Sequence, residues 1–379
     1  MTKKYLLAPG PTPVPANVLL SMAMPMIHHR APDFLPILES ARAGLKWLFQ
    51  TKNDVLILCS SGTGGMVASV TNFFNTGDKV LVVNGGKFGE RWTKICETYG
   101  LKVKEITVEW GYAVKPSDIE SILKAEPDIK GVFMQAVETS TGVYYDVETI
   151  AKIVRNFENT LLIVDAISAL VAHDIKSDDW GIDIMVGGSQ KGLMLPAGLS
   201  FVSISDKAWK ANESSRLPRF YFNLKKERDN LLKNQTNFSS PVSLIIGLNE
   251  AIKMLQAEGL ENVFARHARL ANATREAVKA IGLNLFSKES PSNSVTAIMM
   301  PEGIDGQTVY KNLREKYGVT GAGGQDKAKG KIYRLAHLGY ADTFDVIVGI
   351  ASLEMALKGL GYNIQLGKAV AKAQELLMK

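Results

Sequence analysis

The sequence has few cysteines and no long apolar run. Only two cysteines, Cys59 and Cys96, occur in 379 residues, which is too few for a disulfide framework and typical of a reducing compartment. No apolar stretch reaches the roughly 18 residues that a membrane-spanning helix requires. Prolines interrupt the N-terminus before the apolar core of a signal peptide could form. We therefore expect a cytoplasmic protein that does not associate with membranes.

The chain also lacks a strong charge bias. Its net charge is only +6, and its hydrophobic fraction of 46% is that of a folded protein, so disorder is excluded. Surfaces that bind nucleic acids cluster Lys and Arg with aromatic residues. Residues 216–234 have both, but Glu227 and Asp229 lie among them. A solvated or subunit-facing loop is the favoured interpretation, and we expect no nucleic-acid partner.

Short apolar runs alternate with amphipathic stretches in the first half of the chain. The runs predict strands at 55–59, 80–83, 103–108, 132–135, 161–166, 183–187 and 199–204. Several are continuous Val/Ile/Leu blocks, which are typical of strands covered on both faces. Helical patterns between them predict a mostly parallel sheet of about seven strands, with one of the last strands antiparallel. Ligands bind such sheets at the carboxyl ends of the strands.

The pattern changes at about residue 241. Two long helical stretches are followed by short strands at 283–286 and 295–300, a glycine-rich loop at 320–325 and a final long helix. This order predicts a smaller α+β domain after the large α/β domain. We expect an N-terminal arm over 1–20, a large domain over 21–255 and a small C-terminal domain over 256–379.

Asp165 and Lys191 are the first candidates for chemistry. Asp165 ends a buried strand, and Lys191 follows in a Gly-Ser-Gln-Lys-Gly turn. A buried carboxylate is costly unless a cation pairs with it, so the two form either a structural salt bridge or a pyridoxal-phosphate site. In such a site Lys forms the Schiff base and Asp keeps the pyridinium nitrogen protonated. The neighbouring Ser189 and Gln190 favour the site.

Three further strand ends carry groups that suit a cofactor. SSGTGGM (60–66) lacks the G-x-G-x-x-G spacing of a dinucleotide loop, so a single phosphate at a helix N-terminus fits better than a dinucleotide, although a tight turn is the alternative. Phe88 either stacks on a flat ring or packs at a helix start. ETSTG (138–142) offers hydroxyls or forms a polar turn. Four strand ends of this kind at one sheet edge indicate a cofactor site.

Together these motifs resemble the class V aminotransferases of pyridoxal-phosphate fold type I, and most of all the alanine–glyoxylate / serine–pyruvate aminotransferase branch. The resemblance covers essentially the whole chain. It is carried by LLAPGPTPVP (6–15), SGTGG (61–65), ETSTG (138–142), VDAISAL (164–170), GIDIMVGGSQKGLMLPAG (181–198) and YRLAHLGY (333–340). It implies a large domain with a mostly parallel seven-stranded sheet and a small C-terminal α+β domain.

The resemblance also implies roles for individual residues. Lys191 is the Schiff-base lysine, Asp165 is the partner of the pyridinium nitrogen, and Arg334 binds the substrate carboxylate with a bidentate fork. The implied cofactor-binding residues are Thr63, Gly64 and Gly65 in the phosphate loop, Gln190 at the phosphate, Thr139 near the phenolic oxygen, Phe88 on the ring, and Thr236 and Ser239 from the neighbouring subunit of a homodimer. Gly65 stands where relatives carry His, and Thr236 where they carry Tyr.

The implied activity is transfer of an amino group from a small amino acid, alanine or serine, to a small 2-oxo acid, glyoxylate or pyruvate, by a ping-pong mechanism. Alternatives are an aspartate aminotransferase, for which Arg30 is a candidate second cation, a lyase such as a cysteine desulfurase, and a non-enzymatic subunit of a redox complex. A desulfurase needs a reactive Cys on a mobile loop, which neither cysteine fits.

Histidines are not placed in the catalytic set. His28 and His29, beside Arg30, either line the substrate entrance or make an ordinary contact with the core. His173, His267 and His337 lack metal-ligand spacing, so we expect no metal site.

Overall fold

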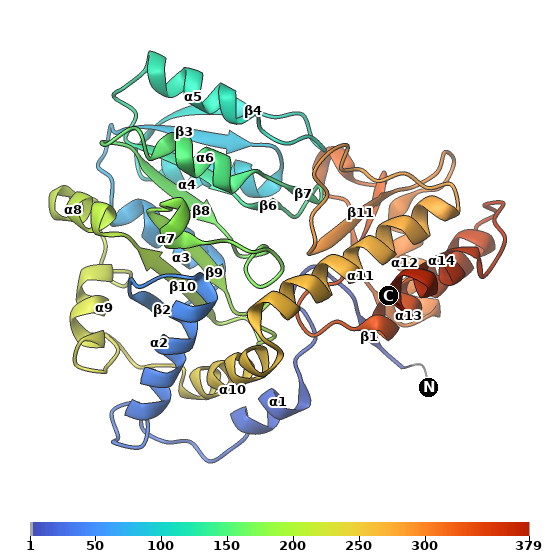
Figure 1. Cartoon of the computed structure of the whole chain (residues 1–379), viewed down its shortest axis with the longest axis horizontal. Helices are drawn as coiled ribbons and strands as arrows, with labels where there is room; N and C mark the ends of the chain where they lie inside the picture. The colour runs from blue at the N-terminus through green and yellow to red at the C-terminus, as the bar shows by residue number, and fades with distance from the viewer. Residues whose placement is uncertain (1–2, 379) are drawn as a thin grey trace.

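The computed structural model describes residues 3–378 (Figure 1). A seven-stranded sheet forms the centre of its larger body. The strand order is β2-β10-β9-β8-β5-β3-β4, and β10 is antiparallel to both neighbours while all other pairs are parallel. The strands are β2 (Val55–Cys59), β3 (Lys79–Asn84), β4 (Lys102–Thr107), β5 (Gly131–Gln135), β8 (Leu161–Asp165), β9 (Ile184–Gly188) and β10 (Leu199–Ile204). The predicted sheet is confirmed, including its antiparallel strand.

Burial explains why these apolar runs form the centre of the sheet. Every residue of β5, β8, β9 and β10 is buried, whereas the edge strand β4 exposes four of its six residues. Helices α3 and α4 pack together on one face, and α5, α6 and α7 pack together on the other (Figure 1). Their bounds are α3 (Gly62–Thr71), α4 (Lys87–Thr98), α5 (Pro116–Ala125), α6 (Val147–Val154) and α7 (Ser177–Trp180).

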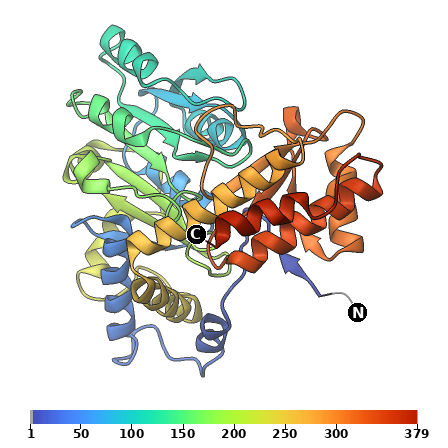
Figure 2. The ribbon, with the colours of Figure 1, turned by 45° about the vertical axis from the view of Figure 1, so that its right-hand side comes forward.

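Further helices surround the sheet and lead out of it. They are α2 (Leu35–Phe49), α8 (Asp206–Ser214), α9 (Leu224–Leu231), α10 (Val242–Glu258) and α11 (Leu260–Ala280). Helix α11 runs from the sheet into the C-terminal body (Figure 2), and both hydrophobic cores include its side chains. Because one helix belongs to both cores, the domain division at 255/256 stays a prediction.

The C-terminal body is a small antiparallel sheet with helices. Its strands lie in the order β11-β14-β13. The elements are β11 (Val295–Met299), α12 (Gly306–Lys316), β12 (Val319–Thr320), β13 (Ala322–Gly323), η1 (Asp326–Ala328), β14 (Ile332–Ala336), α13 (Thr343–Gly359) and α14 (Lys368–Leu377). The strand expected at 283–286 is reduced to one bridge between Leu285 and Ile298.

The N-terminal segment joins the two bodies instead of forming a simple arm. β1 (Tyr5–Leu6) pairs with β12 in the C-terminal body, and α1 (Ala16–Met22) packs against α10. The arm predicted over 1–20 is therefore partly helical. Between β1 and α1 the chain passes over the carboxyl edge of the large sheet, where Thr12 N–H donates to the Gln190 carbonyl at 3.2 Å. Between residues 3 and 378, no helix has the length and apolar character needed to cross a membrane.

Neutral histidines also lie between the two bodies. His267 on α11 is fully buried, and its Nε2 accepts the N–H of Gly339 at 3.0 Å. His337 is buried and bonds through Nδ1 to the Asn293 carbonyl at 2.7 Å. Burial lowers the pKa of both rings to about 3. Each ring must therefore stay neutral for these contacts to persist.

We predict that this arrangement makes the fold sensitive to mild acid. The pKa of His267 is about 3 when folded and about 6.5 when unfolded, so the unfolded chain takes up a proton first as the pH falls. Stability is full above pH 6.5 and is lost toward pH 3, by about 2 kcal/mol at pH 5 for this one group. His267→Gln keeps an acceptor for Gly339 but cannot titrate.

Urea unfolding at pH 7 and pH 5 tests this prediction. The wild-type protein should lose about 2 kcal/mol more between the two pH values than His267→Gln does. His28→Asn, at an exposed position, serves as the control and should keep the wild-type difference. An identical loss in His267→Gln and wild type would contradict the assignment.

Candidate active site

Side chains from the ends of five strands of the large sheet meet around one cavity at its carboxyl edge. The cavity has a volume of about 100 Å³. Six of the predicted site residues line it: Thr63, Phe88, Thr139, Asp165, Gln190 and Lys191. Asp165 is the last residue of β8, and Lys191 lies in the turn after β9. The sheet topology brings these distant segments together, as expected for parallel strands.

Lys191 is held by the N-terminal segment. Its Nζ donates to the carbonyl oxygen of Pro9, and its own carbonyl accepts a 2.9 Å hydrogen bond from the Thr12 hydroxyl. A Cβ on Gly10 would overlap the end of the lysine side chain, so the backbone lies directly against it. Burial lowers the pKa of Lys191 to about 8, the nearby Arg334 charge adds to the lowering, and Asp165 opposes it. A large share of the amine is therefore neutral near pH 8.

Asp165 is buried at the end of β8 without a salt bridge to Lys191. Its Oδ1 accepts the N–H of Ile167 at 2.8 Å, while Lys191 Nζ points to Pro9. Burial raises the pKa of Asp165 to about 6, and the hydrogen bond and the charges of Arg91 and Lys191 oppose this rise. The carboxylate is thus ionised at neutral pH and faces a cavity where it could pair with a cationic ring nitrogen.

The start of α3 can receive a phosphate. Ser61 precedes the helix without a side-chain cap, and the positive end of the helix dipole faces the cavity at Ser61, Gly62 and Thr63, while the Gly64 N–H donates to the Ser61 carbonyl at 2.8 Å. Gln190 Oε1 is buried without a hydrogen-bond partner. Arg91 donates from Nη1 to the Thr63 hydroxyl at 3.2 Å, which adds a positive charge beside the loop.

The glycines of this loop have a packing role. Gly64 and Gly65 do not line the cavity. A Cβ on Gly64 would overlap the Ser60 side chain, and a Cβ on Gly65 would lie 2.8 Å from Val186 Cγ1 on β9. Both residues therefore allow α3 to approach the sheet closely, and any cofactor contact they make would involve the backbone.

Arg334 lies on β14, beside the cavity and not in its wall. It is buried, and its guanidinium donates to two backbone carbonyls: Nη1 to Thr139 at 3.0 Å, and Nε and Nη2 to Gly323 at 3.1 and 2.9 Å. Burial lowers its pKa to about 10, so it stays charged at neutral pH. Three N–H groups fix the plane of the guanidinium, and two remain for a carboxylate.

Thr236 and Ser239 are not brought to this cavity within one chain. They line a separate small hollow that also includes Cys59, Tyr221 and Glu227. Thr236 donates to the Phe238 carbonyl at 2.9 Å. Their implied contact with a cofactor in the neighbouring subunit stays a prediction.

Several residues around the cavity were not expected from the sequence. Arg91 follows Phe88 by one helical turn, and this spacing could have drawn attention to it. Ser168, in the VDAISAL motif, accepts a 2.8 Å hydrogen bond from Thr139 Oγ1. Glu138 belongs to the ETSTG motif, but only the hydroxyls of that motif suggested a cofactor contact. The Pro9 carbonyl had no sequence signal, because any residue carries such a group.

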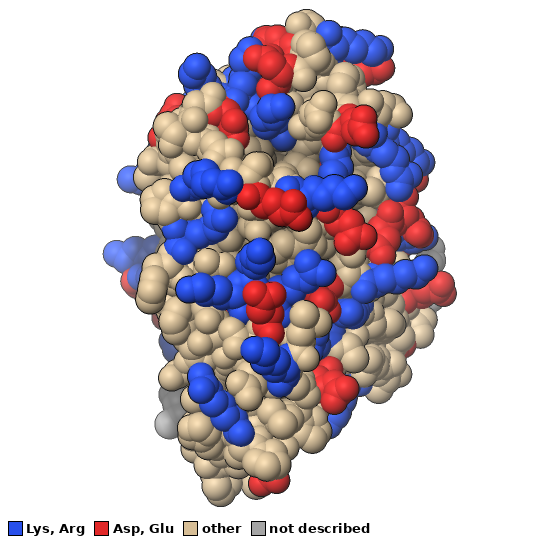
Figure 3. All heavy atoms as spheres, turned by 90° about the vertical axis from the view of Figure 1, so that its left-hand side faces the viewer, with Lys and Arg blue, Asp and Glu red and all other residues tan. Residues whose placement is uncertain are grey.

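A larger hollow lies at the opposite edge of the sheet. It has a volume of about 870 Å³ and includes basic and acidic side chains, among them Lys130, Arg155, Lys207, Glu158 and Asp183. Lysines and arginines are spread among acidic residues over the face in Figure 3. Within the chain from 3 to 378, no group of three or more His, Cys, Asp and Glu side chains is arranged to hold a metal ion.

The fold and the site together define a family. The family model "Aminotransferase class-V" matches residues 4–338, and the chain belongs to the class V aminotransferases of pyridoxal-phosphate fold type I. The resemblance and the cofactor class predicted from the motifs are confirmed, since enzymes of this family use pyridoxal phosphate.

Individual relatives carry several names. The chain is 43% identical to "Soluble hydrogenase, small subunit" of Synechococcus sp. (99% of this chain, 98% of the relative). It is 40% identical to L-aspartate–glyoxylate aminotransferase of Paracoccus denitrificans (97% and 94%) and 39% identical to serine–glyoxylate aminotransferase of Hyphomicrobium methylovorum (99% and 95%). The crystal structure of ureidoglycine–glyoxylate aminotransferase from Bacillus subtilis matches with a TM-score of 0.94 at 30% identity, covering 100% and 99%.

The residues around the cavity fit pyridoxal phosphate. The uncapped start of α3 and the unpartnered Gln190 suit the phosphate, the buried Asp165 carboxylate suits the ring nitrogen, and the Lys191 amine suits the aldehyde. The Phe88 ring lines the same cavity. The individual roles of these residues stay predictions.

We predict that Gly10→Ala impairs cofactor binding. The new methyl group would occupy the space of the Lys191 side chain, so the apoprotein should bind pyridoxal phosphate at least about tenfold more weakly, a loss of about 1.4 kcal/mol. An absorbance titration measures this dissociation constant. Gly77→Ala is the matched control, because Gly77 also has a positive φ, of 89°, but has no neighbour within 4 Å. If Gly10→Ala bound pyridoxal phosphate with the wild-type dissociation constant, the close contact between Gly10 and the Lys191 side chain would be contradicted.

Proposed function

We propose that this protein is a pyridoxal-phosphate-dependent aminotransferase that transfers an amino group from alanine or serine to glyoxylate or pyruvate by a ping-pong mechanism. The observation that carries the proposal is the placement of the Lys191 amine at one cavity with the Asp165 carboxylate, beside the Arg334 guanidinium. Two of the relatives act, by name, with glyoxylate and an amino acid.

The cofactor, when bound, supplies an electron sink that makes the Cα proton of an amino acid acidic. Asp165 would accept a hydrogen bond from the protonated ring nitrogen and keep that nitrogen cationic. Lys191, with a pKa of about 8, is a suitable base for the Cα proton and a suitable acid for its return. The Pro9 carbonyl, which already accepts from Nζ, would stabilise the ammonium form in between.

Arg334 would orient the substrate through its carboxylate. A guanidinium fork forms two parallel hydrogen bonds to a carboxylate, and the bonds from Arg334 to Thr139 and Gly323 fix the plane of that fork. Donor and acceptor bind in turn, so one anchor serves both half-reactions. A single carboxylate anchor suits small monocarboxylate substrates.

A specific observation also favours aspartate as an alternative donor. Arg91 lines the cavity and provides a second guanidinium, and one relative is named an L-aspartate–glyoxylate aminotransferase. Arg30, the candidate that the sequence suggested for this charge, is exposed and does not line the cavity. Arg91 is therefore the better candidate for a second carboxylate.

Two other functions, that of a cysteine desulfurase and that of a non-enzymatic subunit, are less well supported. Cys96 is buried within α4, where burial raises its thiol pKa, and Cys59 lies at the end of β2 outside the cavity, so neither suits the nucleophile of a desulfurase. The non-enzymatic role has the name of one relative in its favour. A scaffold, however, would have no need for a lysine with a lowered pKa at a cofactor cavity.

We further propose a homodimer in the cytoplasm. In it, Thr236 and Ser239 of each chain contact the phosphate bound by the other chain. Phe220 and Tyr221, near these residues in the sequence, are 81% and 46% exposed, which is typical of a protein interface. The two unpaired cysteines fit a reducing compartment.

A substrate panel tests the proposed function. With pyridoxal phosphate present, alanine and serine should each donate to glyoxylate with kcat/KM at least about tenfold above that of aspartate, because Arg91 is already bonded to Thr63 of the phosphate loop and Arg334 is left to bind one carboxylate. Coupled assays of the oxo-acid products measure this ratio. A preference for aspartate would replace the donor assignment, and no turnover with any donor would contradict the aminotransferase proposal.

Two substitutions separate chemistry from binding. Lys191→Ala should abolish turnover, because the amine that accepts the Cα proton is lost. Arg334→Gln should raise the KM for alanine about 100-fold, since a charge-assisted pair is lost. Lys210→Ala and Arg314→Gln, at exposed positions, are the matched controls and should behave as wild type. Retained turnover in Lys191→Ala would remove this lysine from the mechanism.

A further inference from the structure

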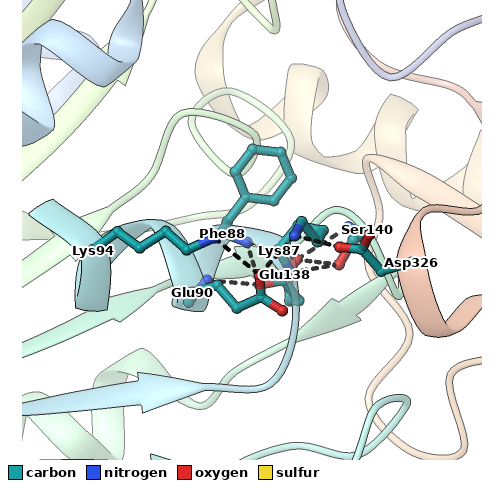
Figure 4. A network of polar contacts seen from close by, with 8 residues as sticks. Lys87, Phe88, Glu90, Lys94, Glu138, Ser140 and Asp326 are labelled. Atoms are coloured by element: carbon teal, nitrogen blue, oxygen red, sulfur yellow. Dashed lines mark hydrogen bonds and ion pairs between the residues drawn. The ribbon is translucent and has the colours of Figure 1, made fainter.

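Glu138 is a buried carboxylate that the proposed mechanism leaves unused. It is the last residue of β6 (Val137–Glu138) and directly precedes Thr139. Its side chain is completely buried. Figure 4 shows the carboxylate at the start of α4, among residues from three segments of the chain. A buried charge at such a position requires strong hydrogen-bond donors.

The first turn of α4 supplies two of these donors. Glu138 Oε2 accepts the N–H of Phe88 at 3.2 Å and the N–H of Gly89 at 3.1 Å. Both are N–H groups that a helix leaves unpaired at its start, where the helix dipole also favours a negative charge. Glu138 therefore caps α4 from a distant strand, while the nominal cap residue, Gly86, has no side chain to do so.

The remaining donors are Gln135 at the end of β5 and Ser140 in the turn after β6. Gln135 Nε2 donates to Oε2 at 2.9 Å, and Ser140 donates to Oε1 from both its N–H, at 3.2 Å, and its hydroxyl. Burial raises the pKa of Glu138, and the hydrogen bonds from Ser140, Gly89 and Phe88 oppose this. Because every partner is a donor, only the ionised carboxylate satisfies all of them.

The loop before α4 has no room to move relative to Glu138. A Cβ on Gly86 would lie 2.5 Å from the carboxyl carbon of Glu138. Lys87 N–H donates to the Ser140 hydroxyl at 3.1 Å, and its ammonium pairs with Asp326 of the C-terminal body (Figure 4). Phe88 is thus held through its backbone on both sides, while its ring lines the cavity.

We propose that Glu138 is a positioning residue for the cofactor: its carboxylate fixes the start of α4 so that the Phe88 ring keeps its place in the cavity wall. This inference rests on the proposed role of Phe88 as the surface on which the cofactor ring stacks. Glu138 does not line the cavity, so its effect on the cofactor passes through Phe88. If Glu138 had a purely structural role, its substitution would lower the stability of the fold, and any effect on cofactor affinity would not depend on the Phe88 ring.

A double-mutant cycle on cofactor affinity tests the inference. The readout is the dissociation constant of pyridoxal phosphate for the apoprotein, from absorbance titration of wild type, Glu138→Gln, Phe88→Leu and the double variant. Phe88→Leu should weaken binding about tenfold, the upper range for an aromatic stack. Glu138→Gln should weaken it about fivefold, and the double variant should be no weaker than Phe88→Leu alone, because Glu138 acts through that ring.

Controls separate the possible outcomes. Glu90→Gln removes an acid from the same helical turn, one that pairs with Lys87 at 2.6 Å but not with the Phe88 backbone, and should bind like wild type. If Glu138→Gln does not fold, Ser140→Ala enters the same cycle with the same expected dependence on Phe88.

The positioning role would be overturned if the double variant bound pyridoxal phosphate more weakly than Phe88→Leu by the factor that Glu138→Gln shows alone. Wild-type affinity in Glu138→Gln would also overturn it. Failure of the wild-type protein to bind pyridoxal phosphate would instead contradict the proposed function.

Discussion

The site depends on buried charges that are held by backbone groups and not by each other. Asp165 accepts from a peptide N–H, Lys191 donates to the Pro9 carbonyl, and Arg334 donates to the carbonyls of Thr139 and Gly323. A direct ion pair would compensate the buried charges of Asp165 and Lys191, but neither group would then be available to bind a ligand. Fixed peptide dipoles instead lower the cost of burial and leave each charge available to a ligand.

This arrangement requires the whole chain. The large body provides Asp165, the turn of Lys191 and the Thr139 carbonyl, whereas the Pro9 carbonyl comes from the N-terminal segment, and Arg334 with the Gly323 carbonyl from the C-terminal body. β1 connects these two parts by pairing with β12. The segment that leads from the C-terminal body to the large one therefore passes over the lysine and completes the site.

Much of the fold and the centre of the site could be predicted from the sequence. Apolar runs, several of them continuous, identified all seven strands, and Asp165 with the Gly-Ser-Gln-Lys-Gly turn, together with the other motifs of the family, indicated the cofactor class. Partners distant in sequence escaped prediction, because the Pro9 carbonyl is a backbone group and Glu138 caps a helix 50 residues before it. The segment around Leu285 pairs with β11 over one bridge only, in which the Phe286 N–H donates to the Ala297 carbonyl at 2.9 Å and the Asn284 carbonyl accepts the Met299 N–H at 2.8 Å.

A single half-reaction tests the central claim most directly. The protein loaded with pyridoxal phosphate is mixed with alanine and no oxo acid, and pyruvate is counted against protein chains. The account predicts about one pyruvate per chain, with loss of the visible absorbance of the bound cofactor, since Lys191 can move the proton only when Asp165 and Arg334 remain charged beside it. Bound cofactor that forms no pyruvate from alanine, no hydroxypyruvate from serine and no oxaloacetate from aspartate would contradict it.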